Sequence, residues 1–177
     1  MERTPVTHIK TEFGSIRGTS SHHYNPAMIL CDRHATEDAG DCFGLCLAYS
    51  GSFTAMAQKD QRDQIRVQMG INPYQFRWCL TEGETFFAPQ VILSFSNQGF
   101  SKLSHQYHDI LHEHMCRGRY KHERRPVLIN NWEATYFDFN EEKIEKIAAQ
   151  AGELGIEMMV LDDGWFGKRD DDNSVLG

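Results

Sequence analysis

The last third of the chain, residues 125–177, carries the pattern that most constrains the fold. Val127–Asn130 is a short apolar run behind a proline, Asn131–Phe139 is a polar and aromatic loop, and Ile156–Leu161 is a second, mostly apolar run. Between the runs, apolar residues recur at helical spacing, namely Ile144, Ile147, Ala148, Ala151 and Leu154. Two strands and a helix within roughly 35 residues have the size of a right-handed βαβ crossover with parallel strands.

The helix of this unit has start and stop signals of its own. Asp138 or Asn140 can cap its N-terminus, and Glu141 and Glu142 fall in the first turn, where the helix dipole favours anions. Gly155 then supplies a C-terminal stop. The pattern therefore predicts a helix that ends just before the second strand.

Both loops that follow these strands contain many polar and aromatic residues that can bind ligands. They are Asn131, Trp132 and Glu133 in the first loop, and Asp162, Asp163, Gly164 and Trp165 in the second. Ligands of parallel α/β folds bind at the carboxyl ends of strands. Two adjacent carboxylates beside an indole suit a sugar, because acids accept hydrogen bonds from hydroxyls and the indole stacks on the sugar ring. Spacing alone leaves open the alternative that Asp162 and Asp163 form only a turn and a helix cap.

Residues 1–100 have the pattern of β structure. Apolar and polar residues alternate in short segments separated by turn signals, which is typical of a β-sandwich. The expected strands include segments around residues 43–47, 53–57, 65–69, 74–80 and 91–95.

A second helix is predicted for residues 101–117, with Ser101 as its cap. Its apolar face consists of Leu103, Tyr107, Ile110, Leu111 and Met115. A basic segment, residues 117–125, follows and is interpreted as a solvated linker. The predicted organisation is a β-sandwich over residues 1–100, a linker helix and basic linker over 101–124, and an α/β region over 125–177.

Charge and composition exclude several classes of partner. The formal net charge of −7 argues against nucleic acid or an anionic membrane as a partner. No apolar run approaches the length needed to span a bilayer, and the chain does not open with a signal peptide.

Five cysteines without CxxC pairs predict reduced thiols in a cytoplasmic protein. His108 and His112 share a helix face, but a third metal ligand is not evident, so no metal site is expected.

Several long motifs resemble one enzyme family in the same order along the chain. NNWEATYFDFNEEKI and LDDGWFGKRDDDNSVLG resemble the bacterial α-galactosidases of glycoside hydrolase family 36, as do RGTSSHHYNP at 17–26, ATED at 35–38 and INPYQFRW at 71–78. The resemblance implies the end of an N-terminal β-sandwich followed by the first βαβ unit of a (β/α)₈ TIM barrel. A complete barrel takes about 250 residues, so we expect the chain to be a fragment.

The resemblance also implies a division of roles among residues. Asp162 and Asp163 match a pair that hydrogen-bonds galactose hydroxyls, and Trp132 matches an aromatic residue near the pocket. Trp165 and Glu133 are expected to shape the loops. The nucleophile and acid/base aspartates of the family belong to later motifs that do not occur in this sequence, so no catalytic residue is assigned here.

The function implied is hydrolysis of terminal α-linked galactose, with retention and without a cofactor. Expected substrates are oligosaccharides of the melibiose or raffinose type, and the full-length protein is expected to be a homo-oligomer. The 177-residue chain by itself should be inactive. Two alternatives remain open, a non-catalytic carbohydrate-binding β-sandwich and a barrel hydrolase resembling α-N-acetylgalactosaminidase.

Overall fold

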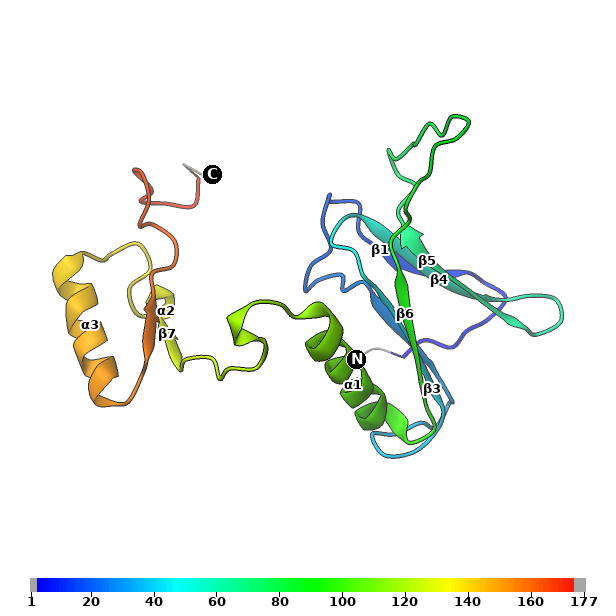
Figure 1. The fold of residues 1–177 in the computed structure, drawn as a ribbon, viewed down its shortest axis with the longest axis horizontal. Coiled ribbons are helices and arrows are strands. Elements are labelled where there is room, and N and C mark those ends of the chain that lie inside the picture. Colours follow the sequence, from blue (N-terminus) through cyan, green and yellow to red (C-terminus); the bar gives the residue numbers. More distant parts are fainter. Residues whose placement is uncertain (1–2, 174–177) are drawn as a thin grey trace. The chain divides into compact units, whose positions relative to one another are not determined.

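The computed structural model describes residues 3–173 and divides the chain into two compact units. Unit 1 is Met1–Met115 and unit 2 is Cys116–Gly177. Antiparallel sheets and a helix make up unit 1, and two parallel strands with their helices make up unit 2 (Figure 1). The structure thus divides the chain at one point, between Met115 and Cys116, whereas the sequence suggested divisions at residues 100 and 124.

Six strands of unit 1 form two three-stranded antiparallel sheets. One sheet has the order β1–β4–β5 and the other the order β2–β3–β6. Their bounds are β1 Thr11–Gly14, β2 Ala27–Cys31, β3 Cys42–Leu47, β4 Phe53–Lys59, β5 Ile65–Ile71 and β6 Val91–Ser96.

The two sheets share one apolar core, which makes this part of the chain a β-sandwich. Phe53 and Ala55 of β4 and Leu47 of β3 are buried together. Residues from both sheets pack around them, namely Phe13, Met28, Met69 and Val91. Alternate residues of β4 face this core, as expected for a strand with one buried face.

Helix α1, Gly99–Ile110, covers the other face of the sheet β2–β3–β6. Phe100 and Leu103 of the helix are buried against Cys42 of β3 and Ala35 of the preceding loop. A helix packed on the outer face explains why both faces of β3 are apolar. The helix therefore belongs to the packed structure of unit 1.

The start of α1 differs from the prediction that Ser101 caps the helix. The helix begins at Gly99, and its first N–H groups donate to backbone carbonyls of the loop at residues 32–41. Phe100 N–H bonds the carbonyl of Thr36 at 3.1 Å, and Ser101 N–H bonds that of Glu37 at 2.9 Å. Ser101 lies inside the helix because a neighbouring loop takes over the capping role.

The end of this helix also differs from the prediction. A π-helical turn, Leu111–Met115, replaces the last α-helical turns. Leu111 and Met115 of the predicted apolar face are exposed there. The buried part of the face is thus confined to the first turns of α1.

The strand predicted for residues 74–80 is wrong. Residues 72–90, all of which the structure describes, contain no strand. The side chain of Asn72 accepts a hydrogen bond from Tyr74 N–H at 2.9 Å, and Gln75 has a φ of 53°, which breaks an extended path. Phe86 instead packs against Trp78 and Phe76 with ring centroids 5.1 and 6.1 Å away. Aromatic contacts within the loop, rather than pairing with another strand, order this segment.

Unit 2 has the βαβ arrangement predicted from the sequence. Strand β7, Leu128–Asn130, pairs in parallel with β8, Met158–Val160, and helix α3, Glu141–Glu153, connects them. The predicted loop after β7 contains a one-turn helix, α2, at Trp132–Thr135.

The predicted ends of α3 are confirmed. Asn140 caps the helix, because its Oδ1 accepts a hydrogen bond from Lys143 N–H at 3.0 Å. Asp138, the other candidate, binds the Lys143 ammonium group at 2.8 Å instead. Gly155 has a φ of 81° directly after the helix, a conformation that favours glycine.

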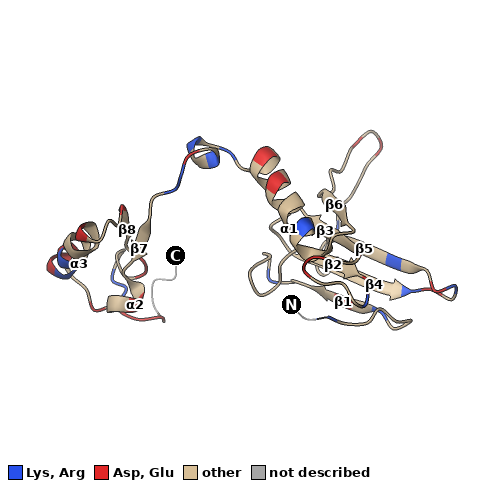
Figure 2. Cartoon of the chain, turned by 90° about the horizontal axis from the view of Figure 1, so that it is seen from below, with Lys and Arg blue, Asp and Glu red and all other residues tan. Residues whose placement is uncertain are grey.

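Charges are mixed over the helices, and basic residues concentrate in one segment. Figure 2 shows Lys and Arg along the chain between α1 and β7, where acidic partners neutralise part of the charge. Arg119 lies 3.7 Å from Glu123, and Arg124 pairs with Glu157. Among the residues described, no helix has both the length and the apolar character needed to cross a membrane.

Candidate functional site

The carboxyl ends of β7 and β8 lie at the same edge of the parallel pair. Asn130 stands opposite Val160 in the strand register, so the loops that follow both strands start side by side. The sequence-predicted residues Asp162 and Asp163 therefore emerge next to the loop that carries Trp132. In parallel α/β folds this edge is where ligands bind.

Two consecutive asparagines fix the position of Asp162. Asn131 is fully buried, and its Oδ1 accepts the backbone N–H of Asp162 at 2.8 Å. The Asn131 amide group donates to Thr135 Oγ1 at 2.9 Å, which ties the same side chain to α2. The amide of Asn130 donates to Asp162 Oδ2 at 2.6 Å. Asp162 is thus held through both its backbone and its side chain while its carboxylate stays exposed.

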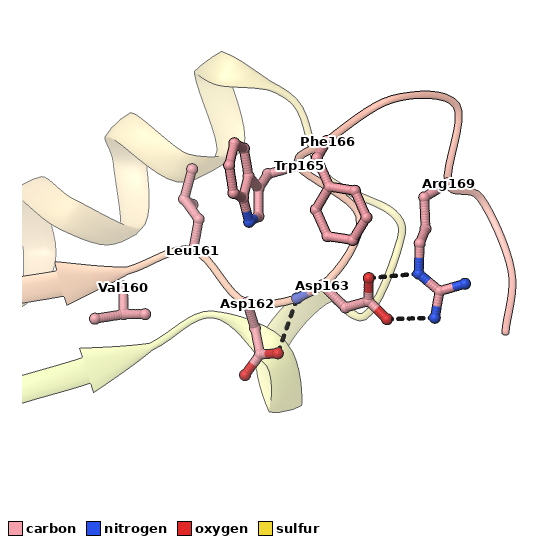
Figure 3. Close-up of a pocket in the computed structure, with 7 residues that line it drawn as sticks. All are labelled: Val160, Leu161, Asp162, Asp163, Trp165, Phe166 and Arg169. Carbon is pink, nitrogen blue, oxygen red and sulfur yellow. Dashed lines mark hydrogen bonds and ion pairs between the residues drawn. The ribbon is translucent and has the colours of Figure 1, made fainter. Parts of the chain in front are cut away.

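Asp163 has a different partner, the buried guanidinium group of Arg169. Arg169 Nε donates to Asp163 Oδ1 and Nη2 donates to Oδ2, both at 2.6 Å, which is a bidentate pair (Figure 3). The guanidinium group also lies over the ring of Phe137, 5.6 Å from its centroid. Hydrogen bonding to Arg169 holds the pKa of Asp163 below its usual value, and the same bond raises the pKa of Arg169.

Asp162 and Asp163 line an open hollow of about 480 Å³. The other lining residues are Val160, Leu161, Trp165, Phe166 and Arg169. Figure 3 shows the indole of Trp165 beside Leu161, with the ring of Phe166 next to it. Trp165 is 64% exposed, so its ring is available to a ligand. The hollow thus combines carboxylates with an aromatic surface, as a sugar site requires.

Trp132, the third sequence-predicted residue, does not line this hollow. It is half-buried at the start of α2, and its backbone N–H donates to Asn130 Oδ1 at 2.8 Å. Its indole makes edge contacts with Tyr136 and Phe137 at centroid distances of 5.4 and 5.0 Å. A role for Trp132 in ligand binding stays a prediction, and the aromatic residues that line this hollow are Trp165 and Phe166.

The two carboxylates differ in the hydrogen bonds they can still accept. A carboxylate offers about four acceptor positions. Asp162 uses one for the N–H of Asp163 and one for Asn130, which leaves about two open among the described contacts. Asp163 uses two for Arg169 and one for the N–H of Gly164, which leaves about one. The geometry therefore makes Asp162 the better acceptor for ligand hydroxyls.

Sequence reasoning missed Arg169 and understated Asn131. Arg169 lies in a run of charged residues that reads as a solvated loop, yet it is 6% exposed. A bulky cation six residues after an aspartate gives no periodic signal, so only the folded loop reveals the pair. The burial of Asn131 likewise has no local sequence signal, because its partners Asp162 and Thr135 belong to separate elements.

The histidines considered for metal binding have other contacts. His108 Nε2 lies 3.4 Å from Ser104 Oγ, and His112 Nδ1 lies 2.8 Å from Glu113 Oε1. Within the part of the chain that the structure describes, no three His, Cys, Asp or Glu side chains are grouped to hold a metal ion.

Two family models match adjacent parts of the chain. The model of the glycosyl hydrolase family 36 N-terminal domain matches residues 1–81, and the Melibiase model matches residues 85–177. The first match covers the strands β1 to β5, and the second covers β6, α1 and all of unit 2.

Curated relatives align over the whole chain but are much longer. The chain is 55% identical to the bifunctional α-galactosidase/sucrose kinase AgaSK of Mediterraneibacter gnavus over 100% of its length, which is 19% of that relative. It is 49% identical to α-galactosidase AgaA of Geobacillus stearothermophilus over 100% of its length, or 24% of AgaA. The chain thus spans about a quarter or less of the relatives' length.

Solved structures agree with the fold. The galactosidase domain of AgaSK matches 99% of the chain with a TM-score of 0.91, and AgaA matches 99% with a TM-score of 0.93. In each case the chain covers 24% of the solved structure. The fold is therefore part of a β-sandwich, a helix and the first βαβ unit of a barrel. The Melibiase match covers more than half of the chain. The chain therefore belongs to the Melibiase family, and a region that matches the N-terminal domain of glycosyl hydrolase family 36 precedes the Melibiase region.

Proposed function

We propose that this chain supplies part of the galactose-binding site of an α-galactosidase. The full enzyme hydrolyses terminal α-linked galactose with retention, through a nucleophile and an acid/base aspartate outside this chain. The observation that carries the proposal is the exposed carboxylate of Asp162, which is held at the end of β8 beside Asp163 and Trp165 in the hollow. No step of the proposed reaction needs a cofactor.

The site has the chemistry to select galactose over glucose. The two sugars differ in the orientation of one hydroxyl, which is axial in galactose. An ionised acceptor aimed at the axial hydroxyl gains a charge-assisted hydrogen bond with galactose, and glucose leaves that acceptor unpaired. Asp162 has open acceptor positions for this role, and the Trp165 ring offers a surface for the C–H side of the sugar.

The names of the relatives support this proposal over the alternatives. AgaSK and AgaA carry α-galactosidase in their names, and a variant of AgaA was solved in complex with raffinose. We propose that the full enzyme to which this chain belongs acts on oligosaccharides of the raffinose and melibiose type. The hollow that includes Asp162 lies in unit 2, which disfavours a sugar-binding sandwich.

Hydrolysis of p-nitrophenyl α-galactoside tests the enzyme part of the proposal. We expect activity from the chain extended along its reading frame and none from the 177 residues alone. Robust activity of the 177-residue chain would contradict our placement of the catalytic aspartates. Inactivity of the extended chain would contradict the proposed α-galactosidase activity.

The substitution Asp162→Asn tests the sugar site directly. It removes the charge with little change in shape, and losing a charged hydrogen bond costs about 1.5–3 kcal/mol, or about 10–100-fold in affinity. Asp138→Asn is the matched control, because Asp138 is an exposed aspartate of the same unit that does not line the hollow. We expect saturation-transfer NMR to show galactose binding lost in Asp162→Asn and kept in Asp138→Asn. Equal binding by both variants would refute the role of Asp162.

We also propose that the full enzyme is a cytoplasmic homo-oligomer. All five cysteines are free thiols, which suits a reducing compartment. Phe43, Leu93 and Phe95 form an exposed apolar face on the sandwich, as surfaces that become buried on assembly do. Sedimentation velocity of the extended chain tests the assembly, and a single monomeric species would contradict it.

A further inference from the structure

Two cysteines face each other across neighbouring strands of the sandwich. In the register of β2 with β3, Cys31 stands directly opposite Cys42. The next pair along, Asp32 with Asp41, is joined by a backbone hydrogen bond of 2.9 Å. Hydrogen-bonded and non-hydrogen-bonded pairs alternate along an antiparallel ladder, so Cys31 and Cys42 form a non-hydrogen-bonded pair. The Cα atoms of such a pair lie about 4.5 Å apart, inside the range of about 4.4–6.8 Å found for disulfides.

The two thiols share one environment but differ in access. Both belong to the apolar cluster under α1, where Cys42 packs with Phe100 and Leu103. Cys42 is fully buried and Cys31 is only partly buried. Burial raises the pKa of the Cys42 thiol, and the nearby Cys31 and Asp32 raise it further. An oxidant in solution therefore meets Cys31 first.

We propose that Cys31 and Cys42 are a cross-strand dithiol that closes into a disulfide when the chain meets a disulfide oxidant such as oxidised glutathione. The Cys31 thiolate attacks one sulfur of the oxidant, forms a mixed disulfide and releases one glutathione thiol. The Cys42 thiolate then attacks the Cys31 sulfur and releases the second glutathione thiol. Two cysteine thiols are oxidised by two electrons in total, one disulfide is reduced, and the two thiol protons end on glutathione.

The bridge would act on α1 through the loop that it closes. Residues 32–41 connect the two cysteines, and this loop caps α1 through the carbonyls of Thr36 and Glu37. Closing a loop of this size removes conformations from the unfolded chain and stabilises the folded state. Oxidation would therefore stabilise both the β2–β3 connection and the start of α1. The dithiol is a redox-dependent cross-link of unit 1.

Peptide mapping of the oxidised chain tests the pairing. The reduced chain is incubated with oxidised glutathione, remaining thiols are alkylated, and the digest is analysed by mass spectrometry. We expect a linked peptide pair, Cys31 with Cys42, that is lighter by two hydrogens than the two thiol peptides. Cys46 is the internal control, because it lies on the same strand opposite Ala27 and has no thiol across from it. Recovery of both thiols, a lasting glutathione adduct on Cys31, or a bridge to Cys46 would each overturn the proposal.

A thermal melt of the same samples tests the consequence. We expect oxidation to raise the melting temperature of unit 1 by roughly 5–15 °C. Cys31→Ser treated with the same oxidant is the matched control and should show no shift. Cys46→Ser should behave like the unchanged chain, which separates the bridge from a general effect of losing a thiol. A disulfide that forms without any change in the melting temperature would refute its stabilising role.

Discussion

The two adjacent aspartates after β8 have unequal partners, and this sets their roles. Asp162 is oriented by neutral amides from Asn130 and Asn131, whereas Asp163 is paired with the buried cation Arg169. Successive residues at a strand end point in different directions, so one carboxylate faces solvent while its neighbour faces the loop. Arg169 orders the loop that carries Trp165 and keeps Asp163 ionised. Asp163 therefore contributes to stability as well as to the site.

Arg169→Gln should raise the pKa of Asp163 toward the ordinary value of an aspartate. In the unchanged chain the folded-state pKa is lowered, so the pair stabilises the fold above the unfolded-state pKa. That stability is lost as pH falls through the folded-state pKa. The variant should be less stable at neutral pH and should lose this part of the acid dependence. Carbon-13 NMR titration of the carboxyl groups measures the shift.

Arg124→Gln provides the matched control for this titration. Arg124 pairs with Glu157 in the same unit and lowers the pKa of that carboxyl. Its loss should raise the pKa of Glu157 and leave that of Asp163 unchanged. An Asp163 pKa that stays low in Arg169→Gln would show that another group holds its charge.

At the scale of elements, one glycine sets the distance between α1 and the sheet. Tyr107 of α1 packs over Gly44 of β3, and a Cβ built on Gly44 would lie 2.5 Å from the tyrosine ring. The Tyr107 hydroxyl donates to the carbonyl of Ile92 in β6 at 3.1 Å, and burial raises its pKa to about 12. The ring can occupy this place only because position 44 has no side chain.

Gly44→Ala should therefore destabilise unit 1 by about 1–3 kcal/mol, the usual effect of overpacking. Denaturant unfolding measures the change, and loss of the Tyr107 to Ile92 hydrogen bond should accompany it. Gly70→Ala is the control in the same sandwich, because a Cβ at Gly70 meets nothing within 4 Å. That variant should be neutral or more stable by up to about 1 kcal/mol. Equal destabilisation of both variants would mean that helix contact is not the cause.

At the scale of the whole molecule, the two units have very different cores. Strand β4 pairs with β1 on one side and β5 on the other, whereas β8 pairs only with β7 among the residues described. Ala151 is the single buried apolar residue of unit 2 in that part of the chain. Small cores and single-sided pairing give low local stability.

Backbone amides of β8 should therefore exchange with solvent faster than those of β4. We expect a difference of at least about 100-fold, which corresponds to about 2.7 kcal/mol of local opening free energy. Hydrogen exchange of the 177-residue chain, followed by NMR or mass spectrometry, measures both strands in one sample. Full protection of β8 together with a single cooperative melt would contradict this prediction.

Elements with local signals were predictable from the amino-acid sequence. Helical spacing and a cap at Asp138 or Asn140 predicted α3, and Gly155 predicted its end; the structure shows that Asn140 is the cap. The apolar runs at each side predicted β7 and β8, although Leu128 and Met158 of these strands are exposed in this chain. The motifs around Asp162 also predicted the family, which the family models match.

Features that depend on partners distant in sequence follow from the folded structure alone. The alternation at residues 74–80 resembles a strand, but no strand pairs with it among the described residues, and strands are stabilised by pairing. The cap of α1 comes from the loop at residues 32–41 rather than from Ser101. Arg169 is buried because Asp163 and Phe137 lie around it after folding. Burial, pairing and ionisation are set by neighbours in space, which the order of residues does not specify locally.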